Sequence, residues 1–520
     1  MKLKVEKVTN IIIKVIYILL LAGINICVFF LAADTKYSYK RKYLLNNISL
    51  WLLGCVVLLG GMALFMVLSK KVKWKLDYCV LIGTIVLFGI QVYICKNIYF
   101  ETAWDAKILV TTARQMGNGI YQGEFDTYFS YYPNNMFLTL VLSWMSKAIT
   151  CLGDVTRQQY LMPMITLQCL ISCATGIFIY KSIRVLINEK WALGGWFFYI
   201  ALLGLNPWLV IVYSDSMALF FSIVCFYLYL KSYSSWKEIV KWIGIGILGG
   251  IGYLIKPQTV IIFIACVLVT FIQIFIRKEK RTLRVGSVGI TLAVLVLVQL
   301  GGNQLVEHCP VTIQKEVKLP ITHWVMMGLH PKGHGAYNRD DVLYTESFTS
   351  TEEMKKANCE VIKERVKEYG AGGMLEHLKK KTLINFADGN FAWRGEGSFF
   401  YKLFPDINSK VSGKLKGLFY YGKSFSGKLR ETFVHGVWLQ VLIWMMAAIK
   451  FVPKVQKKDG VQVLMVTLIG TVLFSLLFEA RARYLMCNVS VYIVLAVLGI
   501  RAVYEALQRK ELLWKNNILS

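Results

Sequence analysis

Long, continuous apolar runs separated by shorter polar stretches dominate this sequence. Most of them approach the roughly 20 residues that a helix needs to cross a bilayer. They do not alternate between apolar and polar positions as half-buried strands do, and helices satisfy their own backbone hydrogen bonds in lipid. We therefore predict an all-α polytopic membrane protein. The runs cover about 11–32, 48–68, 77–98, 134–150, 160–180, 191–206, 216–231, 239–255, 259–276, 286–302, 434–450, 461–478 and 484–502.

The basic residues between the runs predict the orientation of the chain. By the positive-inside rule, the N-terminal MKLKVEK, the KKVKWK segment at 70–75 and the RKEKRTLR segment at 277–284 belong on the cytoplasmic side. An inside N-terminus and thirteen crossings would leave the C-terminus outside, whereas the basic C-terminal tail favours the inside. We therefore expect about twelve crossings, with the doubtful run lying within 134–231.

This topology predicts four parts of the chain. Residues 1–76 form an N-terminal transmembrane helix pair, and residues 77–302 form a transmembrane core. The core contains a first external loop at 99–133, which we expect to be catalytic and to carry interfacial helices. Residues 303–433 form a larger, mostly helical external segment, and residues 434–520 form C-terminal transmembrane helices with a basic cytoplasmic tail.

The external segment contains clear helix boundaries. Ser350 followed by Glu353 is a capping-box pattern, which predicts a helix start. Gly370 is a typical C-terminal stop, and a second helix is expected at about 373–386.

Composition fits a membrane protein and limits the partners. The chain is 56% hydrophobic and 17% charged, with a formal net charge of +28. In a soluble protein that charge would suggest a nucleic-acid partner. Here the basic residues lie between apolar runs, which the positive-inside rule explains, so we expect the lipid bilayer and no nucleic acid.

The first candidate for chemistry is the segment NIYFETAWDAKILVTTA at 97–113. Asp105 and Glu101 lie there, at the expected outer edge of the membrane. One interpretation is that Asp105 only caps the following helix. The other is that this carboxylate acts on a substrate that also sits at the bilayer edge.

Further polar residues are expected at the same level. YFSYYPNNMFL contains Tyr132, Asn134 and Asn135, which suit hydrogen bonding to a sugar but also resemble ordinary interfacial residues. Asp215 in VYSDSM begins an apolar run and suits either a substrate contact or a helix cap. Lys256 in YLIKPQTV lies between two apolar runs. It is interpreted either as a group that binds substrate or as an ordinary interfacial lysine.

The EARARYL segment before the last apolar run contains two arginines on the expected outer face. Positive charge is disfavoured there, so these arginines indicate a specific role. Arg481 and Arg483, followed by Tyr484, suit phosphate recognition, since a guanidinium can donate two parallel hydrogen bonds. The alternative is an internal pair between Glu479 and an arginine.

The ITHWVMMGLHPKGHG segment contains His323 and Trp324, with His330 and His334 further on. The histidine spacing is not that of a helical zinc motif. We therefore expect no metal site here, and predict a substrate-facing loop that dips toward the bilayer.

Together these motifs resemble the GT-C glycosyltransferases. The shared features are a Trp–Asp pair in the first external loop, Tyr–Pro–Asn at the next helix, YSD, THWVMMGL and EARARYL, which cover about 77–502. The sequence is most similar to bacterial protein-mannosyltransferase and aminoarabinose-transferase relatives, the glycosyltransferase family 39-like enzymes. The resemblance implies a GT-C-type transmembrane bundle in the cell membrane, with an active site on the extracytoplasmic face.

The resemblance also implies an inverting transfer from a polyprenyl-phosphate-linked sugar to an extracytoplasmic glycan, lipid or protein. Asp105 would be the general base, and Arg483, with Arg481 or Lys256, would stabilise the leaving phosphate. Eukaryotic protein-mannosyltransferases carry an Asp–Glu pair where this chain has Asp105 followed by Ala106. No cofactor is therefore certain, and a divalent cation, Mg²⁺ or Mn²⁺, stays an open alternative.

Two other classes of function stay open from the sequence. A polysaccharide polymerase or ligase would also use lipid-linked substrates, external loops and arginines. A transporter or flippase would explain the many helices, but it would place its polar groups near the membrane midplane. Convergence of Asp105 and Arg483 in one place favours a transferase.

Overall fold

The computed structural model describes residues 2–31, 43–71, 75–151, 153, 157–232, 236–277, 280–395, 409–420, 424–450 and 458–519. Within these ranges the regular structure is entirely helical. Nine of the described helices are long and apolar enough to cross a membrane. The prediction of an all-α polytopic membrane protein is therefore confirmed. These helices are α1 (Lys2–Phe30), α3 (Leu76–Ile98), α7 (Arg157–Leu186), α11 (Trp236–Ile255), α12 (Val260–Ile276), α13 (Arg281–Glu307), α19 (Phe425–Ala447), α20 (Lys458–Leu477) and α21 (Met486–Leu519).

The difference from the expected twelve crossings falls mainly within 134–231, where the doubtful run was placed. Helices α6 (Met136–Thr150), α8 (Glu189–Tyr199) and α10 (Leu219–Leu230) are 15, 11 and 12 residues long. At 1.5 Å per residue they extend about 16–22 Å, short of the roughly 30 Å hydrocarbon core. Pro207 explains part of this, because the chain turns into a 3₁₀ segment there instead of continuing the helix. The apolar run expected at 48–68 forms a further helix, α2 (Asn47–Lys71).

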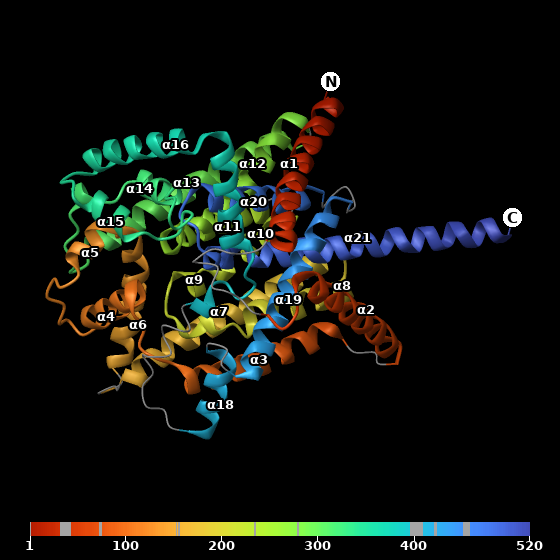
Figure 1. Cartoon of the computed structure of the whole chain (residues 1–520), viewed down its shortest axis with the longest axis horizontal. Coiled ribbons are helices and arrows are strands. Elements are labelled where there is room, and N and C mark those ends of the chain that lie inside the picture. The colour runs from red at the N-terminus through yellow and green to blue at the C-terminus, as the bar shows by residue number, and fades with distance from the viewer. Residues whose placement is uncertain are drawn as a thin grey trace.

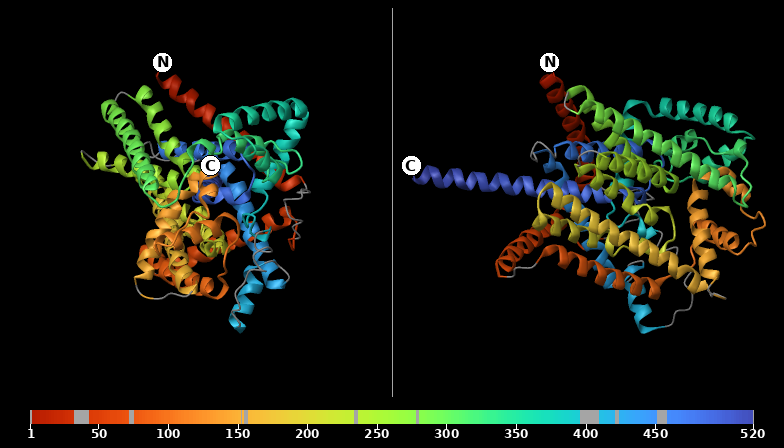
Figure 2. Two further views of the ribbon diagram at one scale, coloured as in Figure 1. Left: turned by 90° about the vertical axis from the view of Figure 1, so that its left-hand side faces the viewer. Right: turned by 180° about the vertical axis from the view of Figure 1, so that it is seen from behind.

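The short helices near the first loop gather at one end of the molecule. Helices α4 (Trp104–Gly117), α5 (Asp126–Tyr131) and α6 lie beside α14 (Ile321–Gly328) and α15 (Arg339–Glu346), on the left of Figure 1. The long helix α16 (Thr351–Phe386) passes above them, while α21 carries the C-terminus away from the opposite end (Figures 1 and 2).

The N-terminal helix α1 packs into the bundle beside the C-terminal helices. The Tyr17 hydroxyl donates to the Met445 carbonyl at 2.7 Å, and Asn25 Nδ2 donates to the Leu442 carbonyl at 3.2 Å. Both donors are buried, so these bonds fix α1 against α19 where water cannot compete.

The helix boundaries expected in 303–433 are confirmed. Ser350 caps α16 by accepting a hydrogen bond from the Glu353 amide at 3.3 Å. Gly370 breaks α16 with φ 53° and ψ −171°, a left-handed conformation that glycine adopts without a Cβ clash.

Hydrogen bonds join the 303–433 segment to the 99–133 segment. The Leu319 amide donates to the Tyr131 carbonyl at 3.2 Å, and the Gln314 amide donates to Ser130 Oγ at 2.9 Å. The Thr312 amide donates to Asp126 Oδ1 at 3.1 Å. Two segments far apart in sequence are therefore held side by side, and the candidate site lies next to this junction.

Candidate functional site

Asp105 lies in the first turn of α4 and is half-buried. The N-cap of this helix is Ala103, which makes no side-chain capping bond, so the capping interpretation of Asp105 is wrong. Its Oδ2 instead accepts a hydrogen bond from the Tyr213 hydroxyl at 3.1 Å. Trp104 has φ 48°, a conformation that is strained for a bulky side chain, and such strain is typical of functional sites.

The surroundings of Asp105 favour its protonated form. Burial raises its pKa above the ordinary value, while the Arg483 charge and hydrogen bonds from Tyr213 and Tyr128 act in the opposite direction. Asn135 Nδ2 donates to the Tyr128 hydroxyl at 2.7 Å and so orients it. The result is a carboxylate that is more basic than an exposed aspartate and is held in position by the Tyr213 hydroxyl.

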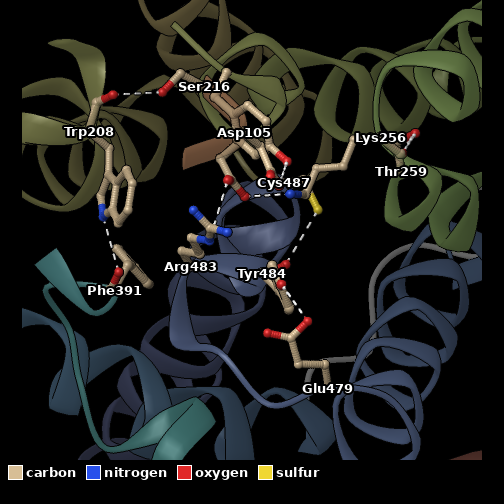
Figure 3. A network of polar contacts seen from close by, with 12 residues as sticks. Asp105, Trp208, Ser216, Lys256, Thr259, Phe391, Glu479, Arg483, Tyr484 and Cys487 are labelled. Carbon is tan, nitrogen blue, oxygen red and sulfur yellow. Dashed lines mark hydrogen bonds and ion pairs between the residues drawn. The ribbon is translucent and has the colours of Figure 1, made fainter. Parts of the chain in front are cut away.

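Asp215, Lys256 and Arg483 form one buried group of charges. Asp215 lies in α9 (Ser214–Met217), whose N-cap is Tyr213, so the capping interpretation of Asp215 is also wrong. The Lys256 ammonium pairs with Asp215 Oδ1, and Arg483 Nε lies 3.8 Å from Asp215 Oδ2. Figure 3 shows Lys256 and Arg483 approaching one another from two sides, and both contact Asp215.

Four aromatic rings surround the Arg483 guanidinium. Its Cζ lies 4.5 Å from the centre of the Trp104 ring, and 5.5–5.7 Å from three further rings, in the range of cation–π attraction. The further rings belong to Trp208, Tyr213 and Tyr484. Trp208 is fixed in turn, because its Nε1 donates to the Phe391 carbonyl at 3.0 Å (Figure 3).

The guanidinium itself makes no hydrogen bond to any residue that the structure describes, and its Nε is buried. Asp215 Oδ2 is likewise buried without a hydrogen bond in the described chain. A buried donor normally finds a partner, because leaving it unpaired costs about 1–3 kcal/mol or more. The described chain therefore supplies no hydrogen-bond acceptor for the buried Nε of Arg483.

Glu479 adds a second carboxylate near this group. It accepts a hydrogen bond from the Tyr484 hydroxyl at 3.1 Å, and the Tyr484 ring lies 5.3 Å from Lys256 Nζ. Burial raises the pKa of Glu479 to about 7, although the charges of Arg483 and Lys381 lower it. The sequence left open an internal ion pair between Glu479 and an arginine. For Arg483, the structure shows the ion pair with Asp215 instead.

Lys381 of α16 approaches Glu479 from the 303–433 segment. Burial lowers its pKa to about 7, and its Nζ donates to the Gly328 carbonyl at 2.8 Å. The adjacent chain is fixed by the Ala480 amide, which donates to the Gly335 carbonyl at 2.7 Å. The 328–335 turn therefore supports the loop that leads to Arg483.

The other residues predicted from the sequence differ in their burial and in their contacts. The Tyr132 ring lies 5.1 Å from that of Tyr128, tilted by 32°, and 6.0 Å from that of Trp324. Asn134 is exposed and donates to Asn135 Oδ1 at 3.3 Å. Glu101 is half-buried in the segment between α3 and α4, and Arg481 is the N-cap residue of the 3₁₀ turn Ala482–Leu485.

His323 lies in the interior of the helices α14–α16. It is fully buried, its Nδ1 is 2.8 Å from Thr345 Oγ1, and burial lowers its pKa to about 4. Its ring touches that of Trp324 at 4.9 Å, so it supports a neighbour of the site from behind. Trp324 is half-buried and His323 packs beneath it, so the His323 side chain is not exposed.

The donor groups here do not fit a divalent cation. Asp215 is already faced by Lys256 and Arg483, and the Arg483 charge also acts on Asp105. Two cationic side chains at these carboxylates oppose a further cation. In the described part of the chain, no three histidine, cysteine or acidic side chains are placed to share a metal ion.

Tyr128, Trp208 and Tyr213 are among the residues of the site that were not predicted as site residues. Aromatic residues at membrane edges are common, so no local pattern distinguishes these three from ordinary interfacial residues. Tyr213 lies two residues before Asp215 in extended backbone, and this position in the YSD segment was the available signal.

Comparisons with known proteins give a family and remote structural likenesses. A family model described as "Conserved hypothetical integral membrane protein" matches residues 5–504. No curated protein sequence matches the chain.

Two of the similar solved structures are of an oligosaccharyltransferase from Archaeoglobus fulgidus. The archaeal enzyme AglB, in complex with an inhibitory peptide and a dolichol-phosphate, is 12% identical, with a TM-score of 0.42 over 84% of this chain and 52% of that chain. The complex with Zn and sulfate is 11% identical, with a TM-score of 0.43 over 81% and 49%. The chain thus spans about half the length of these proteins.

Proposed function

We propose that this chain, which belongs to the conserved hypothetical integral membrane protein family, is a glycosyltransferase of the GT-C type. It transfers a sugar from a polyprenyl-phosphate-linked donor to an acceptor hydroxyl at the extracytoplasmic face of the cell membrane. The observation that carries the proposal is the buried Arg483 guanidinium, which has no hydrogen-bond partner in the described chain and lies next to Asp105.

The donor phosphate supplies the acceptor that Arg483 lacks. A guanidinium can donate parallel hydrogen bonds to phosphate oxygens, and such charge-assisted bonds are roughly twice as strong as neutral ones. Lys256 lies on the other side of Asp215 and adds positive charge close by. The aromatic rings around Arg483 fix its orientation before the donor arrives.

Asp105 is the general base of this reaction. It takes the proton from the acceptor hydroxyl while the oxygen attacks the anomeric carbon. The new glycosidic bond forms as the bond from that carbon to the phosphate oxygen breaks, and attack from the opposite face inverts the anomeric centre. The polyprenyl phosphate leaves as an anion, and Arg483 and Lys256 stabilise the charge that develops on it.

The electrostatics of Asp105 suit this role. Burial raises its pKa, and the efficiency of a general base increases as its pKa approaches the working pH. The hydrogen bond from Tyr213 holds one carboxylate geometry and lowers the pKa, against the effect of burial. Positioned base catalysis of this kind contributes about 10²–10⁴-fold in rate.

A transfer assay tests the proposal. The purified full-length protein in nanodiscs receives a panel of radiolabelled polyprenyl-phosphate sugars and a crude envelope fraction as acceptor. Wild type should transfer label from at least one donor, and Asp105→Asn should lose transfer while still binding that donor. Asp340→Asn, an exposed aspartate on α15, is the matched control and should behave as wild type. Equal transfer by Asp105→Asn and wild type would remove Asp105 as the base.

A further inference from the structure

The chain leaves α-helical geometry between α8 and α9, and we name residues 200–213 the broken segment. It consists of a π-helical turn at Ile200–Gly204, a 3₁₀ turn at Pro207–Val210, and extended backbone at Ile211 and Tyr213. All of its residues are buried or half-buried. Buried backbone outside a continuous helix needs hydrogen-bond partners from other elements, because its own ladder is interrupted and lipid offers none.

Gln168 of α7 supplies two of these partners. Its Nε2 donates to the Leu209 carbonyl at 2.9 Å, and its Oε1 accepts from the Tyr213 amide at 3.3 Å. The Gln168 side chain is fully buried, so water does not compete for either bond. One side-chain amide therefore spans residues 209–213 and fixes the backbone that carries the Tyr213 side chain.

This part of the broken segment carries contacts of the candidate site. The Tyr213 hydroxyl donates to Asp105 Oδ2 at 3.1 Å. The Tyr213 ring lies 5.0 Å from the Trp104 ring and 5.6 Å from Arg483 Cζ. Two residues further along the chain, Asp215 forms its ion pair with Arg483. The backbone position at residue 213 therefore decides where a phenol meets Asp105 and where a carboxylate meets Arg483.

Gln91 of α3 plays a comparable part at the other end of the broken segment. Its Nε2 donates to the Gly204 carbonyl at 2.6 Å and lies 3.3 Å from Ser172 Oγ. Its side chain is also buried. The two glutamines share their chemistry and burial, but Gln168 holds the residue that donates to Asp105, whereas Gln91 holds the end of the π-helical turn.

The 3₁₀ turn between these two ends has anchors of its own. Asn206 Oδ1 accepts from the Trp208 amide at 3.0 Å. Ser216 Oγ donates to the Trp208 carbonyl at 2.9 Å (Figure 3). A change at Gly204 is therefore separated from Tyr213 by a turn that is fixed independently, and we expect loss of the Gln91 bond not to reach the site.

We propose that Gln168 is a positioning residue, which holds the Tyr213 phenol on Asp105 and keeps Asp215 against Arg483. It acts through the backbone of residues 209–213 and does not touch the substrate. Its part in sugar transfer rests on the proposed function, whereas the placement of Tyr213 on Asp105 does not.

The first test reports the contact between Tyr213 and Asp105 without any reaction. meta-Fluorotyrosine takes the place of Tyr213 in the full chain in nanodiscs, and fluorine NMR is recorded with and without Asp105→Asn. In the otherwise wild-type protein the signal should move on Asp105→Asn, because the phenol loses a carboxylate acceptor. Gln168→Met removes both amide groups at similar volume, and the response to Asp105→Asn should then be lost. Gln91→Met is the matched control and should keep the full response.

Transfer kinetics and thermal unfolding give the second readout. Gln168→Met should slow transfer about tenfold or more, because small displacements of positioned groups can cost up to about 10²-fold in rate. Gln91→Met should lower the thermal midpoint by a similar amount and transfer within about twofold of wild type. Gln168→Glu keeps an oxygen for the Tyr213 amide and loses the amide donor, so it should transfer faster than Gln168→Met. If Gln168→Met does not fold, Gln168→Glu takes its place, with a fluorine response smaller than that of wild type.

Three results would overturn the proposal: no fluorine response to Asp105→Asn in the otherwise wild-type protein, a full response in Gln168→Met, or equal losses of response in Gln168→Met and Gln91→Met. The outcomes also separate this inference from the proposed function. A response lost only in Gln168→Met, in a protein that transfers no sugar, would keep the positioning of Tyr213 and reject the transferase. Transfer that depends on Asp105, with a full response and a wild-type rate in Gln168→Met, would keep the transferase and reject the role of Gln168.

Discussion

Arg483 and Arg277 are both arginines beside an aspartate within this protein, but their neighbours differ. Arg277 donates to both oxygens of Asp459, at 2.8 and 2.9 Å, and lies 3.9 Å from Glu6. We name this group the Arg277 clamp. It joins the end of α12 to the start of α20 and uses the guanidinium in the fork geometry that carboxylates match.

The Arg483 cluster, defined as Asp105, Asp215, Lys256 and Arg483, has a looser geometry around its arginine. The distance from Arg483 Nε to Asp215 Oδ2 is 3.8 Å, without a hydrogen bond, and aromatic rings surround the guanidinium. The Arg277 clamp satisfies its own hydrogen bonds and stabilises the fold. The Arg483 cluster leaves the buried Arg483 Nε without a hydrogen bond among the described residues, which is the arrangement expected where a ligand completes the site.

Replacing the aspartates sharpens this comparison most. Asp105→Asn should reduce the rate of sugar transfer about 10²–10⁴-fold, because it removes the base, and should leave the thermal midpoint nearly unchanged. Asp459→Asn should retain transfer and lower the midpoint, because Arg277 loses its bidentate partner. Transfer kinetics and thermal unfolding of both variants check this, and a reversed pattern would break the comparison.

Replacing the arginines by lysine gives the next largest effect. Arg483→Lys keeps the charge but removes the fork, so we expect about 10- to 100-fold slower transfer, matching the 1.5–3 kcal/mol of a charge-assisted hydrogen bond. Arg277→Lys should lower the thermal midpoint and leave the transfer rate within about twofold of wild type. Equal losses of rate in both variants would show that Arg483 is no more than a second structural ion pair.

The pH dependence of stability separates Glu479 from the clamp. An unfolded glutamate has a pKa of about 4.3, whereas in the folded protein burial raises that of Glu479 to about 7. The folded state binds more protons in this interval, so the unfolding free energy should fall as pH rises from about 4.3 to about 7. Glu479→Gln should remove a few kcal/mol of that fall in unfolding free energy. The variant should therefore be more stable than wild type at about pH 8, and the two proteins should have similar unfolding free energies near about pH 4.

Thermal unfolding in a pH series measures this effect. The groups that face Glu479 are Arg483, Tyr484, Asp105 and Lys381, and all four are kept in Glu479→Gln. The same pH dependence in wild type and Glu479→Gln would assign it to another group.

The smallest predicted effect concerns Tyr213. Its hydrogen bond lowers the pKa of Asp105, so Tyr213→Phe should raise that pKa further. The acid limb of the transfer rate should move up by about one pH unit, with little change well above it. A pH–rate profile tests this, and Tyr227→Phe, a half-buried tyrosine of α10, serves as the control. An unmoved acid limb would mean that this phenol does not act on the base.

Much of the fold was predictable, because continuous apolar runs leave few alternatives to helices in lipid. The lengths of the helices within 134–231 were not. Pro207 and the turn before it end a run that is apolar throughout, and hydropathy alone does not report where a helix stops.

The candidate site was predictable as a set of residues but not as an arrangement. Asp105, Asp215, Lys256 and Arg483 each stand out as a charge at the edge of an apolar run. Their contacts depend on how distant helices pack, which no local pattern reports. His323 shows the opposite case, since its polar side chain in the THWVMMGL segment suggested a substrate contact, whereas Thr345 is its partner in the interior.

The most direct test of the account is the affinity of the protein for a polyprenyl phosphate, the leaving group of the proposed reaction. Native mass spectrometry of wild type, Arg483→Lys and Arg277→Lys would measure it on the intact chain. The account predicts binding to wild type and Arg277→Lys with similar affinity, and about tenfold or more weaker binding to Arg483→Lys. Equal affinity in all three proteins would contradict the claim that the Arg483 guanidinium recognises the donor phosphate.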